Sequence, residues 1–344
     1  MGGRFAADRE ATVVTEGSPA PTLRDVGEDA VIAAVTAVYP PPPPWLELGP
    51  GDDAAVLAPL AGRLVVSTDA LVEGEDFLPE WSGGHDVGVK LAAQNLADVA
   101  AMGARPLGLV VTLAAPADRE VGWAVAVSHG LAEECARAGA AVIGGDLSAG
   151  PVAMLTATAL GVLDGPAVRR DGARPGDVVA VAGRLGPAAA GLQLLFDARD
   201  GRRAPGLDEA AVREAVTAQV RPRPPYAAGA AAAAAGATAM IDTSDGLLRD
   251  AARSARASGV TLDLSREGLA ADVAGLRPVA RDDAQAWEWV LSGGEDHAML
   301  ACFPPGSALP PGFRGIGRVV PQGGSAVVLD GETWRGTQGW VHWS

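Results

Sequence analysis

The sequence predicts a mixed α/β protein with mixed sheets that folds in two halves. Three observations lead to this prediction. Short apolar runs alternate with helical patterns along the chain, and a charged segment rich in glycine and proline interrupts them at residues 165–176. A chain of 344 residues is long enough for two domains, and its 48% of hydrophobic residues is typical of globular proteins.

The first half is expected to contain a tail, a helix, a proline spacer and then alternating strands and helices. Small, polar and charged residues predict a disordered tail over 1–20, so the first domain would span 21–165. Apolar residues recur at helical spacing from Thr22 to Tyr39, and five prolines at 40–44 end that helix. The strands expected next are 54–57, 64–67, 107–113, 141–143 and 154–163, with helices at 86–104 and 120–138.

The second half, residues 166–344, is expected to form another mixed α/β domain. Residues 224–241 make the longest uncharged run, but alanine dominates it, so we expect a buried helix there rather than a membrane span. The N-terminus also lacks the apolar segment of a signal peptide, which favours a cytoplasmic protein. The expected strands are 178–182, 238–241, 260–264, 298–303 and 326–329, and the helices are 187–198, 207–220, 224–235 and 245–258.

The charged residues exclude several functional classes. With 27 basic and 42 acidic residues the net charge is −15, which argues against broad nucleic-acid binding because such binding depends on neutralising phosphates. Lys90 is the only lysine, and no Gly-Lys-Ser/Thr sequence surrounds it, so the chain has no P-loop. Cys135 and Cys302 are too few for a disulfide framework or a zinc ribbon, and protein-kinase signatures are absent.

Acidic residues gather beside glycine and small polar residues, mainly near the ends of predicted strands. One such cluster alone is typical of a turn or a helix cap, and that explanation stays open for each of them. Converging carboxylates would repel each other, by roughly 3 kcal/mol for a pair about 5 Å apart at an effective dielectric of about 20, and so would need cations. Hard oxygen ligands suit Mg²⁺, Mn²⁺ or Ca²⁺, and Mg²⁺ commonly brings a phosphate-bearing partner. The clusters are 51–53, 67–69, 72–76, 144–146, 242–246 and 293–296.

A polar stripe crosses the otherwise apolar helix predicted at 86–104. Lys90, Gln94 and Asp98 recur at every fourth position, with Asn95 beside them. A solvated helix face is one interpretation, and a helix that directs Asp98 and Asn95 into a site is the other. Ser244, at a predicted helix start, fits a phosphate or metal contact. These residues predict a site for Mg²⁺ and a nucleotide.

The motifs, in their order along the chain, resemble those of thiamine-monophosphate kinases in the PurM-like ATP-binding superfamily. The resemblance implies that ATP and several Mg²⁺ ions serve the phosphorylation of thiamine monophosphate to thiamine diphosphate, by direct in-line transfer. It also implies a PurM-like architecture, with an N-terminal domain that pairs across a homodimer and a C-terminal α/β domain. The matching segments are 27–28, 51–56, 67–74, Lys90 with 95–104, 143–146, 170–177, 241–247, 292–296 and 339–342.

The resemblance assigns roles to individual residues. Implied catalytic residues are Asp98, Asp146 and Asp242. Implied nucleotide contacts are Gly145, Asp146, Arg170 and Ser244, and implied substrate contacts are Asp76, Glu295 and Trp340. The implied Mg²⁺ ligands are Asp53, Ser67, Thr68, Asp69, Asp98, Asp146, Asp242 and Asp245.

Asp76 departs from the family pattern, which has a histidine at this position. An imidazole donates a hydrogen bond to a phosphate, whereas an ionised carboxylate does not. Asp76 would therefore face the thiazolium cation, reach the phosphate through a metal, or point away from the substrate. Trp340 has two interpretations as well: stacking on the cationic aromatic substrate, or packing of the C-terminal segment.

Two alternatives to the kinase remain open from the sequence. One is another ATP-using member of the superfamily, although Cys135 and Cys302 match neither the N-terminal cysteine of selenophosphate synthetases nor the C-terminal cysteine of hydrogenase-maturation members. The other is a non-catalytic descendant that binds nucleotide or metal, for which Asp76 is the only support.

Overall fold

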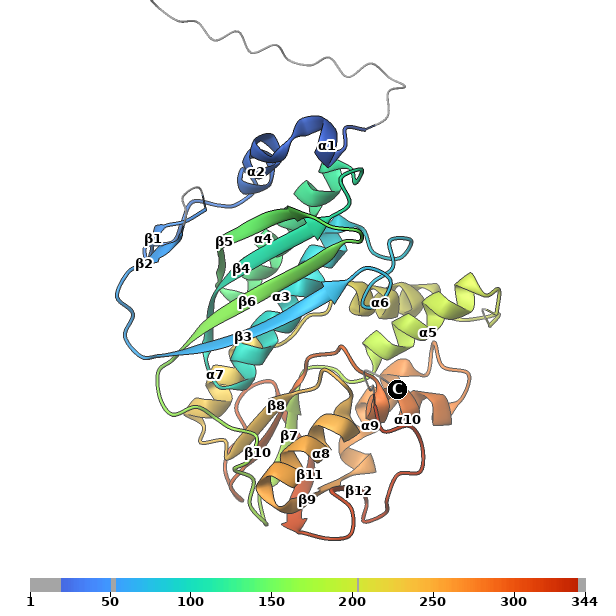
Figure 1. Cartoon of the computed structure of the whole chain (residues 1–344). Helices are drawn as coiled ribbons and strands as arrows, with labels where there is room; N and C mark the ends of the chain where they lie inside the picture. The colour runs from blue at the N-terminus through green and yellow to red at the C-terminus, as the bar shows by residue number, and fades with distance from the viewer. Residues whose placement is uncertain (1–19, 51–53, 203, 340–344) are drawn as a thin grey trace, which may run out of the picture.

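Two β-sheets, one from each half of the chain, organise the fold (Figure 1). The structure is a computed structural model that describes residues 20–50, 54–202 and 204–339. Both sheets combine parallel and antiparallel strand pairs, and helices pack against each of them, so the predicted mixed α/β class is confirmed. The tail predicted at 1–20 lies, except for its last residue, outside the described residues.

The first half forms a four-stranded sheet in the order β3-β6-β4-β5, and β1 and β2 form a separate two-stranded sheet. In chain order, its elements are α1 (Leu23–Val26), α2 (Glu28–Thr36), β1 (Leu46–Leu48), β2 (Val56–Leu57), β3 (Arg63–Val72), α3 (Gly84–Ala101), β4 (Arg105–Ala115), α4 (Val121–Ala138), β5 (Ala141–Ala149) and β6 (Met154–Leu163).

The single helix predicted from Thr22 to Tyr39 is wrong, because the structure divides it at Gly27. Thr22 and Asp25 form a reciprocal capping box at the start of α1. Gly27 then adopts φ +82°, a left-handed conformation that favours glycine and stops the helix before α2 begins.

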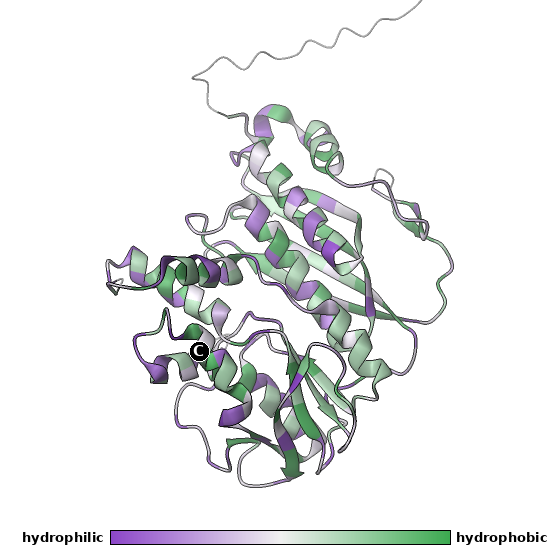
Figure 2. Cartoon of the chain, turned by 180° about the vertical axis from the view of Figure 1, so that it is seen from behind, coloured by the Kyte–Doolittle hydropathy of each residue, from purple (hydrophilic) through white to green (hydrophobic). Residues whose placement is uncertain are grey.

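Helices cover one face of the first sheet and leave the other face open. Figure 1 shows the sheet, which curves into half a barrel, with no helix in front of it, whereas Figure 2, from behind, shows two long helices crossing it. These helices are α3 and α4, and they pack closely because Gly88 and Gly130 lack side chains at their crossing. A Cβ added to Gly88 would lie 2.1 Å from the carbonyl oxygen of Val127.

The second half forms a six-stranded sheet in the order β12-β9-β11-β7-β10-β8. Its elements are β7 (Val178–Ala182), α5 (Pro187–Arg199), α6 (Glu209–Val220), α7 (Tyr226–Ala234), β8 (Ala239–Asp242), α8 (Leu247–Ser258), β9 (Val260–Leu264), α9 (Arg266–Leu276), α10 (Asp283–Ser292), β10 (Met299–Phe303), β11 (Phe313–Pro321) and β12 (Val327–Leu329). The sequence predicted no element at the positions of β1, α9, α10 and β11. None of the helices in the described residues is both long and apolar enough to cross a membrane.

Helix α3 lies between the two halves of the molecule. Alternate residues of β7 face two different cores: Val179 and Val181 pack with α8 and α9, whereas Ala180 and Ala182 join the core that contains α3 and α7. Most residues of α3 are therefore buried, and its polar side chains face the junction between the halves.

Candidate functional site

The site begins where β3 meets α3. Side chains alternate along a strand, so Ser67 and Asp69 face α3. The Ser67 hydroxyl donates a hydrogen bond of 2.7 Å to the Asp98 carboxylate, and the Asp69 amide donates one of 2.9 Å to the side-chain oxygen of Asn95. Lys90 and Asn95 are buried, so the polar stripe of this helix is not a solvated face.

Thr68 faces the other side of the sheet. Its hydroxyl donates to the carbonyl oxygen of Ala157 at 3.0 Å and accepts a bond of 3.3 Å from Thr158. The structure therefore separates Thr68 from Ser67 and Asp69, although all three lie in one predicted cluster.

The second half contributes Asp242 and His297 to the same region. Asp242 is the last residue of β8, and its carboxylate lies 3.1 Å from Nδ1 of His297. His297 is 5% exposed and has φ +50°, a conformation uncommon outside glycine. Its amide donates to the Thr243 carbonyl oxygen at 3.1 Å, which fixes this loop against the end of β8.

Burial and mutual repulsion determine the electrostatics of this cluster. Burial, followed by the negative charge of Asp242 and, more weakly, that of Asp69, raises the pKa of Asp98 to about 7, although the hydrogen bond from Ser67 opposes the shift. Burial also raises the pKa of Asp69. Burial lowers the pKa of His297, but the hydrogen bond and charge of Asp242 outweigh it, and the net shift is upward. Three carboxylates thus lie close enough for their charges to act on one another.

Asp245 lies beside the cluster but is engaged by arginines. Its carboxylate is 2.5 Å from Arg253 and 3.4 Å from Arg249, both on α8. Its amide donates to the buried Asp250 carboxylate at 2.9 Å. Burial, followed by the charge of Asp242, raises the pKa of Asp250 to about 7. The neighbouring Ser244 precedes α8, and its carbonyl oxygen accepts a bond from the Glu295 amide at 2.8 Å.

The predicted substrate residues Asp76 and Glu295 meet at Lys90. The Lys90 ammonium group donates to the Glu295 carboxylate at 2.6 Å and to the Asp76 carbonyl oxygen at 3.2 Å. The Asp76 carboxylate instead accepts a bond of 2.8 Å from the Val72 amide, which closes the turn after β3. The structure thus shows the Asp76 carboxylate bonded within its own turn, and it does not choose among the three interpretations of this residue.

The predicted nucleotide residues on β5 lie apart from the carboxylate cluster within one chain. Asp146 is aligned across the sheet with Thr112, Thr156 and Ala70, three strands away on β3. With about 4.8 Å between strands, roughly 14 Å separates the two rows along the sheet. Asp146 is exposed on the uncovered face, and Gly145 packs where a Cβ would lie 2.2 Å from the carbonyl oxygen of Val111. The Gly-Gly-Asp sequence is therefore part of a strand and not a tight turn.

Arg170 lies beside the C-terminal part of α8. Its carbonyl oxygen accepts hydrogen bonds from Ser254 at 2.8 Å and from Ser258 at 3.2 Å, whereas Ser244 precedes the other end of that helix. The structure therefore does not bring the backbones of Arg170 and Ser244 together. Two other predicted residues, Asp53 and Trp340, lie outside the described residues.

Comparisons with known proteins place this geometry in a family. Residues 51–163 match the family described as AIR synthase related protein, N-terminal domain. The curated thiamine-monophosphate kinase of Mycobacterium tuberculosis is 47% identical over 322 residues, which cover 93% of this chain and 92% of that protein. The thiamine-monophosphate kinase of Corynebacterium glutamicum is 36% identical over 328 residues, 93% of this chain and 94% of that protein. The chain belongs to the thiamine-monophosphate kinase family.

Solved structures of thiamine-monophosphate kinases share the fold. The crystal structure from Stenotrophomonas maltophilia has a TM-score of 0.74 and 33% identity, covering 88% of this chain and 95% of that one. AaThiL complexed with AMPPCP and TMP has a TM-score of 0.70 and 28% identity, covering 95% of this chain and 100% of that one. Hydrogenase maturation protein HypE in complex with ATP, with a TM-score of 0.58 and 20% identity, shares the fold alone and covers 81% of this chain and 84% of that one.

Sequence reasoning missed three polar residues of this kinase-family site. His297 directly follows the predicted Gly-Gly-Glu-Asp motif, and that adjacency was the available signal. Asp250 and Arg253 resemble ordinary charged residues of an exposed helix in the sequence. The burial of Asp250 and the contacts of both residues with Asp245 arise only when α8 packs against the second sheet.

The donor set fits Mg²⁺ in combination with phosphates. In the described residues, no three His, Cys, Asp or Glu side chains are arranged to hold a metal ion by themselves. The carboxylates of Asp69, Asp98 and Asp242 nevertheless interact strongly enough to raise the pKa values of Asp69 and Asp98. Lys90 does not neutralise them, because it is bonded to Glu295. Mg²⁺ is usually bound by one or two carboxylates together with water and substrate phosphates, which matches this open arrangement.

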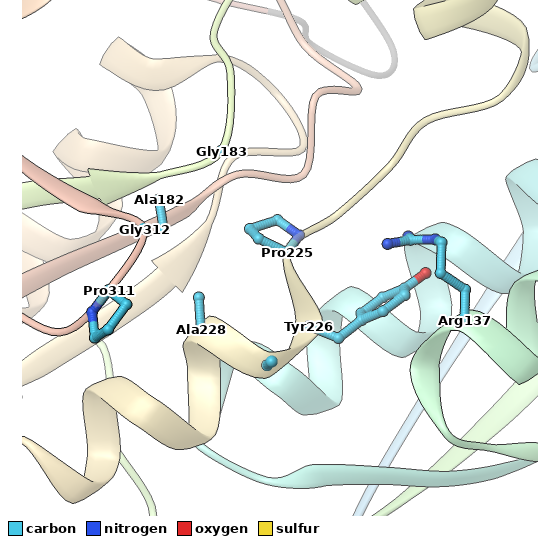
Figure 3. A pocket seen from close by; sticks show the side chains of 9 residues that line it. Arg137, Ala182, Gly183, Pro225, Tyr226, Ala228, Pro311 and Gly312 are labelled. Carbon is cyan, nitrogen blue, oxygen red and sulfur yellow. The ribbon is translucent and has the colours of Figure 1, made fainter.

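A cavity of about 320 Å³ lies away from the predicted site residues, none of which lines it. Tyr226 and Arg137 border it, and Figure 3 shows the guanidinium of Arg137 beside the Tyr226 hydroxyl. That hydroxyl donates to the buried Glu134 at 2.6 Å, and Arg137 bonds both Glu134 and the Pro224 carbonyl oxygen. These polar groups satisfy one another and join α4 to α7.

Proposed function

We propose that the protein transfers the terminal phosphoryl group of ATP to thiamine monophosphate, producing thiamine diphosphate and ADP. The observation that carries this proposal is the end-to-end match to thiamine-monophosphate kinases, at 47% identity over 93% of the chain for the Mycobacterium tuberculosis protein. The structural relative AaThiL was solved with AMPPCP and TMP, and it covers 95% of this chain. The carboxylate cluster between the two halves supplies the chemistry that such a transfer needs.

The acceptor needs no general base. The second pKa of a phosphate monoester is about 6, so its oxygen is already largely ionised at neutral pH. The protein must instead bring two anions together in line, in a region of low polarity. Mg²⁺ ions, when bound, neutralise the developing charge and align the two phosphates.

The carboxylates hold these cations in the proposal. Asp242 is buried, Asp98 is partly buried and Asp69 lies beside them at the surface, and burial together with the charge of Asp242 raises the pKa of Asp98. These residues are distributed over both halves of the chain. They are therefore expected to bind several ions along the triphosphate rather than to surround a single ion. The proposed ligands are Asp53, Ser67, Thr68, Asp69, Asp98, Asp146, Asp242 and Asp245.

The remaining assignments follow the same resemblance. Gly145, Asp146, Arg170 and Ser244 are proposed to contact the nucleotide. Glu295 and Trp340 are proposed to contact thiamine monophosphate, and Asp76 shapes the turn beside them through its bond to Val72. We also propose a cytoplasmic location.

A homodimer is part of the proposal, with the first sheet as the contact. The uncovered face of that sheet carries exposed apolar side chains, which water disfavours in a contiguous group. They are Leu64, Val66, Val110 and Met154.

The test is to identify products after incubating the purified protein with ATP, Mg²⁺ and thiamine monophosphate. Thiamine diphosphate and ADP in equal amounts are expected. A reaction without thiamine monophosphate controls for simple ATP hydrolysis, and a reaction with EDTA controls for the metal. Release of free phosphate without thiamine diphosphate would show a different ATP-using activity and overturn the proposal.

A further inference from the structure

Lys90 occupies a position that the transfer reaction does not by itself explain. It extends from α3 and is 3% exposed, although lysine is rarely buried unless it is paired. Its ammonium group lies 2.6 Å from the Glu295 carboxylate and 3.2 Å from the Asp76 carbonyl oxygen. One lysine of the first half thus bonds a turn of its own half and a loop of the second half.

Gln219 completes the environment of Glu295. From the end of α6, its side-chain nitrogen donates to the same Glu295 oxygen, Oε2, at 2.8 Å. Across residues 20–50, 54–202 and 204–339, the other oxygen of that carboxylate, Oε1, accepts no hydrogen bond. The Glu295 side chain is 35% exposed, so one oxygen is held and the other is accessible to a ligand.

The backbone of Glu295 is held as firmly as its side chain. Its φ of +68° is uncommon for a non-glycine residue, and its amide donates to the Ser244 carbonyl oxygen at 2.8 Å. The preceding Gly294 packs against Ser244, where a Cβ would lie 2.6 Å from the Ser244 carbonyl oxygen. Strain of this kind persists only where the surrounding contacts over-determine the conformation.

We propose that Lys90 is a positioning residue that, together with Gln219, holds Glu295 so that its free Oε1 faces thiamine monophosphate. This inference rests on the proposed function, in which Glu295 contacts that substrate. A free glutamate side chain would lose conformational entropy when it binds, and fixing it beforehand removes that cost. Lys90 also balances the charge of Glu295. Through its bond to the Asp76 carbonyl oxygen it holds the turn after β3 as well.

A double-mutant cycle tests whether Lys90 acts through Glu295. Glu295→Gln and Lys90→Met are each expected to raise the KM for thiamine monophosphate about tenfold, while kcat and the KM for ATP change less than threefold. The double variant is expected to have a KM no higher than the worse single variant, because both changes remove the same interaction. Lys90→Arg is expected to restore part of the loss, since it retains a charged donor.

Arg137→Met is the matched control for a purely structural effect. Arg137 is also a partly buried cation. It bonds Glu134 of its own helix and the carbonyl oxygen of Pro224 in the second half. Its loss is expected to lower Tm and to leave the KM for thiamine monophosphate unchanged. If Lys90→Met does not fold, Gln219→Met takes its place in the cycle, with an expected KM increase of about threefold.

Three results would overturn the inference, and one of them would also change the proposed substrate site. If the KM increases of the two single variants multiply in the double variant, Lys90 acts independently of Glu295. An unchanged KM in Lys90→Met or its replacement would show that the contact does not position the substrate residue. An unchanged KM in Glu295→Gln would also remove Glu295 from the proposed substrate site, whereas formation of thiamine diphosphate by the unmodified protein would still support the proposed function.

Discussion

Asp98 is the residue on which the proposed metal site depends most. Its pKa is about 7 because it is buried and lies near Asp242 and Asp69, so the ionised form destabilises the metal-free fold. Asp98→Asn is expected to reduce kcat at least 100-fold while leaving Tm in EDTA unchanged or higher. Steady-state kinetics and thermal melts check this, with the surface variant Asp164→Asn as the control. Normal turnover in Asp98→Asn would reduce Asp98 to a residue of the α3 surface.

Several raised pKa values predict how metal-free stability depends on pH. Asp98, Asp250 and Asp296, all poorly solvated, have pKa values of about 7 in the folded chain, against about 4 when unfolded. Between these values the folded state binds more protons, so the free energy of unfolding falls as pH rises from about 4 to about 7. Denaturation in EDTA should show this decline. Adding Mg²⁺ should raise Tm more at pH 8 than at pH 5.5, and Asp98→Asn should weaken that difference.

Substitutions of Asp76 can show whether its carboxylate stabilises the turn or contacts the substrate. Its carboxylate accepts from the Val72 amide, and an asparagine oxygen retains that role. Asp76→Asn is therefore expected to keep Tm and the KM for thiamine monophosphate within twofold, whereas Asp76→Ala should lose about 1 kcal/mol of stability. Chemical denaturation and kinetics measure both. A tenfold higher KM in Asp76→Asn at unchanged Tm would instead indicate direct substrate contact.

Individual residues show how far the sequence specifies the site. Asp98 was predictable because a carboxylate within an apolar helix is unusual, and Ser67 and Asp69 followed from their motif. The burial of Lys90 was not predictable, because a polar stripe on a helix has the same spacing whether it faces water or another domain. The role of His297 depends on the left-handed turn after Gly293 and Gly294, which juxtaposes it with Asp242.

At the scale of elements, the strands with continuous apolar runs were predicted best. The bounds of β6, β7 and β9 agree with the sequence prediction, whereas the predicted strand at 141–143 extends to Ala149 as β5. Strand β11 was not predicted because Gly315 and Gly317 interrupt its alternation of side chains, and its register with β7 shifts between them. Gly317 is needed where β11 approaches the backbone at Asp263. Helix α10 was also not predicted, although Asp282 is a helix-capping residue that the sequence shows directly before it.

The crossing of α3 and α4 predicts unequal effects of two glycine substitutions. At Gly88 an added methyl group would meet the Val127 carbonyl oxygen at 2.1 Å, which forces the helices apart. Gly88→Ala is expected to destabilise by about 1–3 kcal/mol, and to reduce kcat because α3 carries Asp98. Gly122→Ala on α4 meets nothing within 4 Å and is expected to stabilise by about 0.5–1 kcal/mol. Urea denaturation of both variants checks the contrast, and equal effects would contradict the packing argument.

For the whole molecule, the distribution of exposed apolar side chains is strongly uneven. The large exposed hydrophobic residues of the described chain all fall between residues 32 and 154, and those on β3, β4 and β6 share the face that no helix covers. Both edge strands of this sheet, β3 and β5, also present unpaired backbone groups within the described chain. A half-barrel that meets a second copy across a two-fold axis would cover both the face and the edges.

The proposed dimer predicts that one charge on this face changes the state of the whole molecule. Val66 is 61% exposed on β3, so in an isolated chain Val66→Asp would cost little. In a dimer that buries this face, the same carboxylate would be desolvated without a partner, which is strongly unfavourable. The unmodified chain and Val66→Leu are therefore expected to elute as dimers in size-exclusion chromatography with light scattering, and Val66→Asp as a monomer with lower Tm. A monomeric unmodified chain, or a Val66→Asp variant that remains dimeric, would show that this face is not the contact between copies.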